Sequence, residues 1–403
     1  MRVFYLDPAL ASDLGHHANS CRCITNELRS RGIETKIFSS HKTDTVLQNE
    51  LRACPHFRAD SYWLNDGDPI CRWLNAFEAS ARLTCEDLAK LVDICADDIV
   101  YLNSGQAAQL YGLALWSATM PANELPRIVM EFGMDPGVDV RFGPNGMTFS
   151  TRDPRMDPRA ILLRFACQKI PPGIGRHIRV GTCEPNSTAV YRPLLGRDVE
   201  VFPLPRDATT AVRRRVGKRP ITVSVLGHQR REKGYHLMPE IARQLLAKRR
   251  DINILVHNGD PELSKAIQQD LRQLAIVDPR LIVDERIAGR TLWPELLDKS
   301  DLVLCPYTSS RFAVSYSAVA SEAVANGMPL VVPARSSLAR LLSDFGDSGE
   351  LFEKAEPSYI VAATLRALSR FDDLAQIAMR GAKKWNEVHG PRRFVDALLK
   401  RQD

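Results

Sequence analysis

The stretch that decides the fold runs from Asp301 to Pro333 and reads DLVLCPYTSSRFAVSYSAVASEAVANGMPLVVP. It begins with the apolar run 302–305, which predicts a strand buried on both faces of a parallel sheet. After a polar loop, residues 317–326 have the composition of a helix, and Gly327 stands where a left-handed C-cap would end it. Residues 330–332 then predict the next strand.

This strand, loop, helix and strand unit predicts where a ligand binds. It leaves the loop and the helix N-terminus at the carboxyl edge of the sheet, where phosphate-bearing ligands bind in open α/β folds. Glu322 lies in the second turn of the predicted helix, close to that edge. We therefore look for a binding site around residues 301–333.

The run SEAVANGMPLVV, residues 321–332, resembles the sugar-nucleotide motif of glycosyltransferase family 4. The resemblance implies an α/β GT-B fold, in which two Rossmann-like domains with parallel sheets face each other across a cleft. It also implies retaining transfer of a sugar from a nucleotide-sugar donor. The family motif has two glutamates separated by seven residues, and here the second is Glu322 while the first position holds Val314.

The resemblance gives these two positions different roles. The second family glutamate binds the ribose diol of the donor, and a carboxylate suits this because it offers two acceptor oxygens to two adjacent hydroxyl groups. We expect Glu322 to keep that role. The first family glutamate contacts the transferred sugar, so Val314 is a departure that bears on sugar identity and on catalysis.

A second motif, GHQRREKG at 227–234, follows another predicted buried strand and resembles the phosphate loop of the family. Lys233 keeps the positive charge that suits a pyrophosphate. The family arginine is replaced by His228, so Arg230 or Arg231 is expected to supply a guanidinium instead. A basic loop that is only solvated is the alternative.

The resemblance assigns further donor-binding positions. Ile287 follows a predicted strand, where the family backbone reads the nucleobase. Ser315, Tyr316, Ser317 and Ala318 form the helix N-terminus that would stabilise the leaving diphosphate.

The first half opens with a predicted strand at 3–6, a loop, and a helix reaching about residue 31. The loop lacks the Gly-x-Gly-x-x-Gly fingerprint, so a dinucleotide cofactor is not expected. Gly15 matches the glycine of the family loop that approaches the donor phosphate. His16 beside it is a candidate catalytic residue, with a structural hydrogen-bonding role as the alternative.

Glu131 follows a predicted strand at 127–130. In the resembling family this strand end often carries a histidine near the reaction centre, so we consider Glu131 a second catalytic candidate that orients or deprotonates an acceptor hydroxyl. A structural carboxylate is the alternative. Residues 48–97 are predicted to be mostly helical, and 137–160 to be a long connection over the cleft.

A chain of 403 residues exceeds one ordinary domain. We expect an acceptor-binding domain at 1–203, a nucleotide-sugar-binding domain at 204–385, and a C-terminal helix at 386–403 that returns to the first domain. The polar and basic stretch 206–219 has the composition of a linker.

Composition narrows the function classes. No stretch approaches the roughly 18 apolar residues of a membrane-spanning helix, and the first residues turn polar too early for a secretory signal. The nine cysteines lack a Cys-x-x-Cys pair, which favours free thiols in the cytoplasm. The net charge of +6 is compatible with nucleotide phosphates or with peripheral contact at the inner membrane surface. The densest basic run has no interleaved aromatics, so nucleic-acid binding is not expected.

These observations predict a metal-independent glycosyltransferase without a cofactor. It would move a sugar from a UDP- or GDP-linked donor to a hydroxyl of a glycan or lipid-linked acceptor, in the synthesis of cell-surface polysaccharides or glycoconjugates. Two alternatives stay open: a catalytically weak GT-B protein that binds nucleotide or glycan as a partner subunit, suggested by Val314 and His228, and a nucleotide-sugar epimerase of related fold. The sequence leaves the donor sugar, the acceptor and the oligomeric state undetermined.

Overall fold

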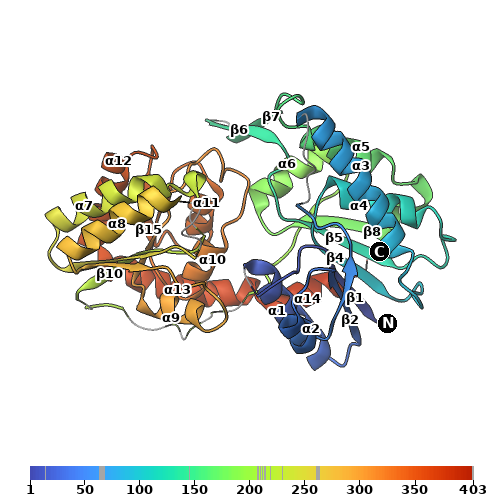
Figure 1. Cartoon of the computed structure of the whole chain (residues 1–403), viewed down its shortest axis with the longest axis horizontal. Helices are drawn as coiled ribbons and strands as arrows, with labels where there is room; N and C mark the ends of the chain where they lie inside the picture. The colour runs from blue at the N-terminus through green and yellow to red at the C-terminus, as the bar shows by residue number, and fades with distance from the viewer. Residues whose placement is uncertain are drawn as a thin grey trace. The chain divides into compact units, whose positions relative to one another are not determined.

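The computed structural model describes residues 1–401, except positions 14, 63–68, 145, 207, 209, 211, 213–214, 218, 229 and 260–263 and the side chains of 69–72. The chain divides into two compact units. Unit 1 comprises Met1–Pro205 with Gly390–Asp403, and unit 2 comprises Arg206–His389. Each unit is an open parallel sheet covered by helices on both faces (Figure 1).

The unit 1 sheet has seven parallel strands in the order β3-β2-β1-β4-β5-β8-β9. The strands are β1 (Val3–Asp7), β2 (Thr35–Ser40), β3 (Ala53–Phe57), β4 (Ile99–Gly105), β5 (Arg127–Phe132), β8 (Ile178–Thr182) and β9 (Glu200–Val201). The order reverses between β1 and β4, which is the topological switch point where ligands bind in such sheets.

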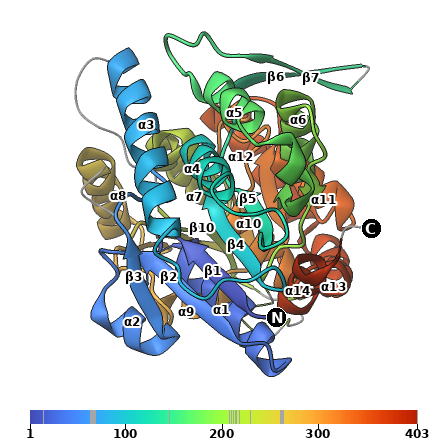
Figure 2. The ribbon, with the colours of Figure 1, turned by 90° about the vertical axis from the view of Figure 1, so that its right-hand side faces the viewer.

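Helices cover both faces of this sheet. They are α1 (His16–Ser30), α2 (Thr45–Leu51), α3 (Pro69–Leu88), α4 (Ala107–Ser117), α5 (Arg159–Gln168), the 3-10 helix η1 (Pro172–His177), α6 (Pro185–Leu195) and α14 (Pro391–Leu399). Helices α3, α4, α5 and α6 pack on one another in one layer (Figure 2), and α1 packs on α14.

The strand alternation explains these two layers. Phe4 and Leu6 of β1 lie in the core beneath α3, α4 and α5. Tyr5 points to the other face, where its ring packs on Tyr101, which in turn packs on Phe394 of α14. The C-terminal helix is therefore part of the unit 1 core.

Two sequence expectations for unit 1 were wrong. The segment expected to be mostly helical, 48–97, contains β3, and the expected connection, 137–160, contains an antiparallel hairpin of β6 (Val138–Gly143) and β7 (Gly146–Thr151). Strand β3 reads ACPHF and lies at the sheet edge, where a proline is tolerated because no ladder partner needs its missing N–H. The hairpin exposes much of its surface, so its sequence lacks an apolar run.

The unit 2 sheet has six parallel strands in the order β12-β11-β10-β13-β14-β15. The strands are β10 (Ile221–Val225), β11 (Ile252–His257), β12 (Leu281–Asp284), β13 (Leu302–Leu304), β14 (Leu330–Pro333) and β15 (Gly349–Phe352). The sequence predicted β10, β12, β13 and β14, because each is an apolar run bounded by polar or turn residues. The order reverses between β10 and β13.

The helical segments of unit 2 are the 3-10 turns η2 (Arg231–Lys233) and η3 (Tyr235–Leu237), and the helices α7 (Met238–Lys248), α8 (Lys265–Val277), α9 (Leu292–Lys299), α10 (Ala318–Ala325), α11 (Ser337–Asp344), α12 (Pro357–Ser369) and α13 (Phe371–Val388). Helices α8, α7 and α12 form one layer, while α10 packs on α11 and α13 (Figure 1). Ser317 caps α10 by accepting from the Ala320 N–H at 3.3 Å, and Gly327 follows α10 with φ +67°.

Gly234 fixes the loop after β10 against the end of β13. Its φ is +71°, and a Cβ built on it would lie 1.9 Å from the carbonyl oxygen of Pro306. No side chain fits this approach, so the contact requires glycine.

We therefore expect Gly234→Ala to destabilise unit 2 by more than the about 1–2 kcal/mol that a left-handed conformation costs an L-residue. Gly217→Ala is the matched control, because Gly217 has φ +78° but nothing within 4 Å of its ideal Cβ. Urea unfolding of both variants measures the difference. Equal losses in the two variants would mean that the Pro306 contact contributes nothing.

Candidate functional site

The loop after β10 brings a cation to the carboxyl edge of the unit 2 sheet. An ideal Cβ on Gly227 would lie 3.8 Å from Lys233 Nζ and 3.2 Å from Val319 Cγ2, in the first turn of α10. Lys233 Nζ also lies 5.6 Å from the centre of the Tyr307 ring. The ammonium group thus lies close to Gly227, and Val319 of α10 borders the same glycine.

Lys233 has the electrostatics of an anion-binding group. Burial lowers the pKa of this half-buried lysine, Cys305 opposes the shift, and the charge of Arg230 lowers the pKa further against a smaller effect of Glu232. Among the described residues, no carboxylate forms an ion pair with it. A bound anion would supply the missing charge, and the adjacent helix N-terminus favours the same sign.

The two arginines predicted to assist Lys233 lie elsewhere on the loop. Arg230 and Arg231 are exposed and line a separate pocket of 690 Å³ together with His236 and Lys265. The structure therefore brings Lys233 to Gly227 and α10, while both arginines border a second, basic surface.

Glu322 is buried within α10, with 2% of its surface exposed. One carboxylate oxygen accepts from the guanidinium Nη1 of Arg206, and the other accepts from the indole N–H of Trp293. Neither partner was predicted from the sequence. Both oxygens thus have hydrogen-bond donors, so a ribose would have to exchange with these contacts.

His257, at the end of β11, connects the loop after β10 to the loop after β12. Its Nδ1 accepts from the Gly227 N–H at 3.2 Å, and its Nε2 donates to the Arg286 carbonyl at 3.0 Å. Its ring also meets that of Trp293 edge-on, 6.5 Å between centres. Sequence reasoning missed this residue, although a polar side chain ending a buried strand was the available signal.

The remaining predicted donor-binding residues lie around the same edge. Ile287 is exposed in the loop between β12 and α9. Ser315 and Tyr316 are half-buried ahead of α10, Ser317 caps the helix, and Ala318 is its first residue. Val314, at the position of the first family glutamate, is buried.

The carboxyl edge of the unit 1 sheet carries a histidine and carboxylate pair. His17 Nδ1 lies 2.9 and 3.0 Å from the two oxygens of Asp7, which ends β1, so Nδ1 carries the proton that both oxygens accept. Its Nε2 lies 3.3 Å from the Tyr62 hydroxyl. Asn103 of β4 donates to Asp7 at 2.7 Å across the switch point. An imidazole held in this tautomer presents Nε2 as a base.

The predicted residues Gly15 and His16 lie directly before this pair. Gly15 has φ +81° and precedes α1, and His16 is the first residue of that helix. The His16 ring lies 4.2 Å from that of His17. The sequence analysis selected His16 as the candidate, whereas the geometry of α1 turns the next residue, His17, toward Asp7.

Glu131 lies in the same unit but is tied to structural partners. It is buried, and its two oxygens accept from the Tyr101 hydroxyl at 2.7 Å and from the Cys183 thiol at 3.0 Å. Burial raises the pKa of Glu131, although these two hydrogen bonds oppose the shift. These contacts fit the structural alternative for this residue.

The described part of the chain contains neither a group of metal ligands nor a membrane-spanning helix. No three or more His, Cys, Asp or Glu side chains gather there in a way that could hold a metal ion. No described helix is both long and apolar enough to cross a membrane.

Sequence comparisons with known protein families and with curated proteins find no match. Comparison with solved structures finds proteins of similar fold. A glycosyltransferase from Rickettsia africae has a TM-score of 0.65 and 12% identity, over 100% of this chain and 99% of that one. Sucrose-phosphate synthase from Thermosynechococcus elongatus has a TM-score of 0.63 and 13% identity, over 99% and 96%. HepE from Anabaena, in complex with UDP and glucose, has a TM-score of 0.61 and 14% identity, over 99% of each chain.

These likenesses extend over the whole chain, so the predicted α/β GT-B fold is confirmed. At these identities the similarity establishes the fold alone. The function has to be argued from the residues of this chain.

The position of His257 generates a pH prediction. Burial lowers its pKa below the ordinary value of about 6.5, with the Arg286 hydrogen bond opposing the shift. Between the lowered pKa of the folded state and the unfolded value of about 6.5, the unfolded state binds more protons than the folded state. The contribution of His257 to the free energy of unfolding is therefore complete above about pH 6.5 and is lost as the pH falls toward the folded-state pKa. Protonated Nδ1 can no longer accept from Gly227.

We expect the hydrogen-exchange protection factor of the Gly227 amide to fall between about pH 7 and pH 5. The Val225 amide, within the β10 ladder, is the internal control and should change less. Protection that falls equally at both amides would contradict the role given to His257.

Proposed function

We propose that this chain is a glycosyltransferase that transfers a sugar from a nucleotide-sugar donor to an acceptor hydroxyl. The observation that carries the proposal is Lys233, a half-buried cation without an ion pair among the described residues, held beside Gly227 and the α10 N-terminus. This arrangement suits a diphosphate. The GT-B fold shared with a glycosyltransferase and with sucrose-phosphate synthase supports it, and the HepE complex with UDP favours a UDP-linked donor.

The family 4 motif around Glu322 favours retention. In that reaction the bond between the donor sugar carbon and the diphosphate oxygen breaks, and its electron pair leaves with the nucleoside diphosphate. The acceptor oxygen bonds to the same carbon and the same face, while its proton passes to the leaving phosphate. Lys233 and the α10 N-terminus would stabilise the charge that develops there, so we propose metal-independent catalysis.

Unit 1 would supply the acceptor side of the reaction. We propose that His17, oriented by Asp7, contacts the acceptor hydroxyl in place of the predicted His16. A glycan or lipid-linked acceptor, in polysaccharide or glycoconjugate synthesis at the cytoplasmic face of a membrane, is the setting in which we place the enzyme.

A panel of UDP- and GDP-sugars tests the proposal directly. Release of nucleoside diphosphate together with a glycosylated product is expected, and NMR of the anomeric proton should show retention. Buried Val314 favours one competing function, a protein that binds nucleotide without turnover. Nucleotide binding without hydrolysis or transfer across the panel would favour that function.

Lys233→Ala should remove most of the thermal stabilisation by UDP. A ligand at about 100 times its Kd stabilises by about 2.7 kcal/mol, and about 1 kcal/mol shifts the Tm of a domain of this size by about 2–4 °C. Arg231→Ala is the matched control on the same loop, because Arg231 lines the separate basic pocket. Differential scanning fluorimetry measures both. A wild-type UDP shift in Lys233→Ala would remove this lysine from the site.

Glu322→Gln should weaken UDP binding by roughly 1.5–3 kcal/mol, the value of a hydrogen bond to a charged group. Because Glu322 also pairs with Arg206, unfolding must be measured beside calorimetric titration. Glu240→Gln is the control, since Glu240 pairs with Arg243 on an exposed part of unit 2. Lost stability with unchanged UDP affinity would make Glu322 a structural residue only.

A further inference from the structure

Unit 1 contains a pocket of 180 Å³ at the carboxyl edge of its sheet. Its walls come from α3, α4, α5 and the segments that follow β3 and β5. Most of the lining is apolar, and its large side chains are Tyr62, Trp73, Phe77, Met134 and Leu162. Nothing in the proposed donor chemistry uses this pocket.

The aromatic wall of the pocket is supported from behind. Phe77 stacks on Tyr111 at 5.6 Å between ring centres with 4° between the planes, and it meets Phe165 edge-on at 6.0 Å. Tyr111 and Phe165 also contact each other at 5.3 Å. Three mutually packed rings from α3, α4 and α5 hold the wall in place, so the pocket is preformed.

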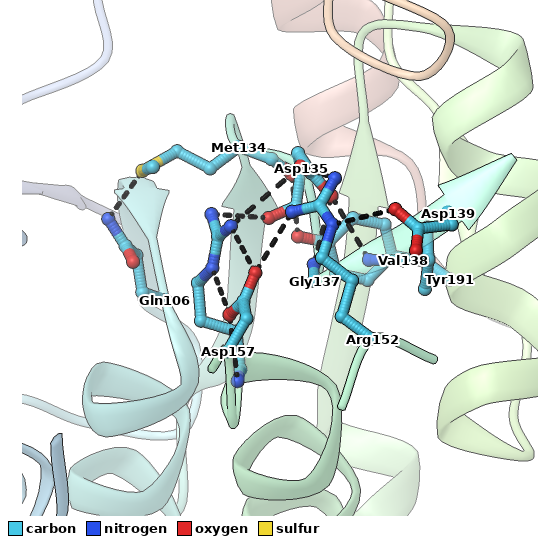
Figure 3. Close-up of polar contacts among 10 residues, drawn as sticks. Gln106, Met134, Asp135, Gly137, Val138, Asp139, Arg152, Asp157 and Tyr191 are labelled. Atoms are coloured by element: carbon cyan, nitrogen blue, oxygen red, sulfur yellow. Dashed lines mark hydrogen bonds and ion pairs between the residues drawn. The ribbon is translucent and has the colours of Figure 1, made fainter. Parts of the chain in front are cut away.

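Met134, on the β5 side, is held by a polar cluster (Figure 3). The Met134 carbonyl accepts from the Tyr191 hydroxyl at 2.9 Å, and its sulfur accepts from Gln106 Nε2 at 2.8 Å. The next residue, Asp135, is buried and pairs with Arg152 at 2.8 Å. The segment after β5 is therefore anchored at consecutive residues.

The charge of the pocket is already balanced. Arg159 is the charged residue that lines it, and its guanidinium pairs with Asp157 at 2.6 Å and donates to the Asp135 carbonyl at 3.0 Å. A charged ligand would find no uncompensated partner here. The pocket therefore favours a neutral ligand.

One polar group in the wall lacks a partner. Ser61 is 7% exposed, and its hydroxyl has no hydrogen-bond partner among the described residues. A buried hydroxyl left unsatisfied costs free energy, and such groups point to a missing ligand or solvent partner. The ligand thus carries a hydroxyl or carbonyl group beside its apolar body.

The pocket adjoins the pair of His17 and Asp7 in unit 1. Tyr62 lines the pocket, and its hydroxyl lies 3.3 Å from Nε2 of His17, which Asp7 orients. A molecule seated in the pocket therefore lies one side chain away from a basic nitrogen.

We propose that this pocket binds a neutral, apolar, ring-sized group of the acceptor, with a hydroxyl or carbonyl oxygen of that group bonded to Ser61. A dry cavity of about 150 Å³ lined by apolar side chains accommodates benzene, so 180 Å³ suffices for one ring. The inference that this group belongs to an acceptor rests on the proposed function. The inference that the pocket binds a neutral, ring-sized group does not rest on it.

Phenol and benzene are matched probes, since they differ only in the hydroxyl group. We expect phenol to shift the carbon-13-labelled methyl resonance of Met134 in the full chain. Ala108→Phe, which fills the pocket from the first turn of α4, should weaken phenol binding at least about tenfold. Leu115→Phe is the control, because Leu115 is 37% exposed on α4 and lies outside the pocket lining.

Ser61→Ala separates the polar contact from the apolar one. It should weaken phenol binding about three- to tenfold and leave benzene binding unchanged, as expected for the loss of one hydrogen bond. An unshifted Met134 methyl in wild type, or equal phenol binding in wild type and Ala108→Phe, would overturn the proposal. Equal loss of phenol and benzene binding in Ser61→Ala would overturn the assignment of the hydroxyl contact.

UDP-induced thermal stabilisation, measured on the same preparations, distinguishes this proposal from the proposed function. UDP stabilisation without phenol binding would refute the pocket and leave the donor site standing. Phenol binding without UDP stabilisation would support an apolar ligand site and refute its role as an acceptor site.

Discussion

The carboxyl edge of the unit 2 sheet depends on the contact of Gly234 with the Pro306 carbonyl. Because Gly234 has no Cβ, the loop after β10 can lie directly on the end of β13, across the switch point of the sheet. That approach carries Lys233 back over Gly227 and toward the first turn of α10. The burial that lowers the pKa of the lysine is thus a consequence of backbone packing, and it makes an anion at this position favourable.

A chain of side-chain contacts extends this arrangement to the other strands. His257 receives the Gly227 N–H and donates to the loop after β12, Trp293 lies edge-on to His257, and Glu322 accepts from Trp293. Each contact joins a different strand end or helix start of one sheet. The loop after β10, the loop after β12 and Glu322 of α10 are therefore connected through side-chain contacts, and changing one of them is expected to move the others.

Unit 1 uses the same sheet edge with different chemistry. Its switch point holds the buried pair of Asp7 and His17, with Asn103 donating to the same carboxylate, while the adjoining pocket is apolar and charge-balanced. Unit 2 presents a cation, and unit 1 presents a base beside an apolar cavity. This division matches a reaction in which one side stabilises a leaving diphosphate and the other receives a neutral acceptor.

The sequence by itself determined most strands of unit 2, because buried parallel strands are apolar runs, whereas their order in the sheet came from the tertiary structure. The resemblance of two short motifs to those of glycosyltransferase family 4 also pointed to Lys233 and Glu322. Only the tertiary structure decided which partners these side chains meet. Arg206 and Trp293 reach Glu322 from distant positions, and the turn of α1 selects His17 over His16. Such contacts join residues far apart in the chain, whereas sequence patterns report burial and local geometry.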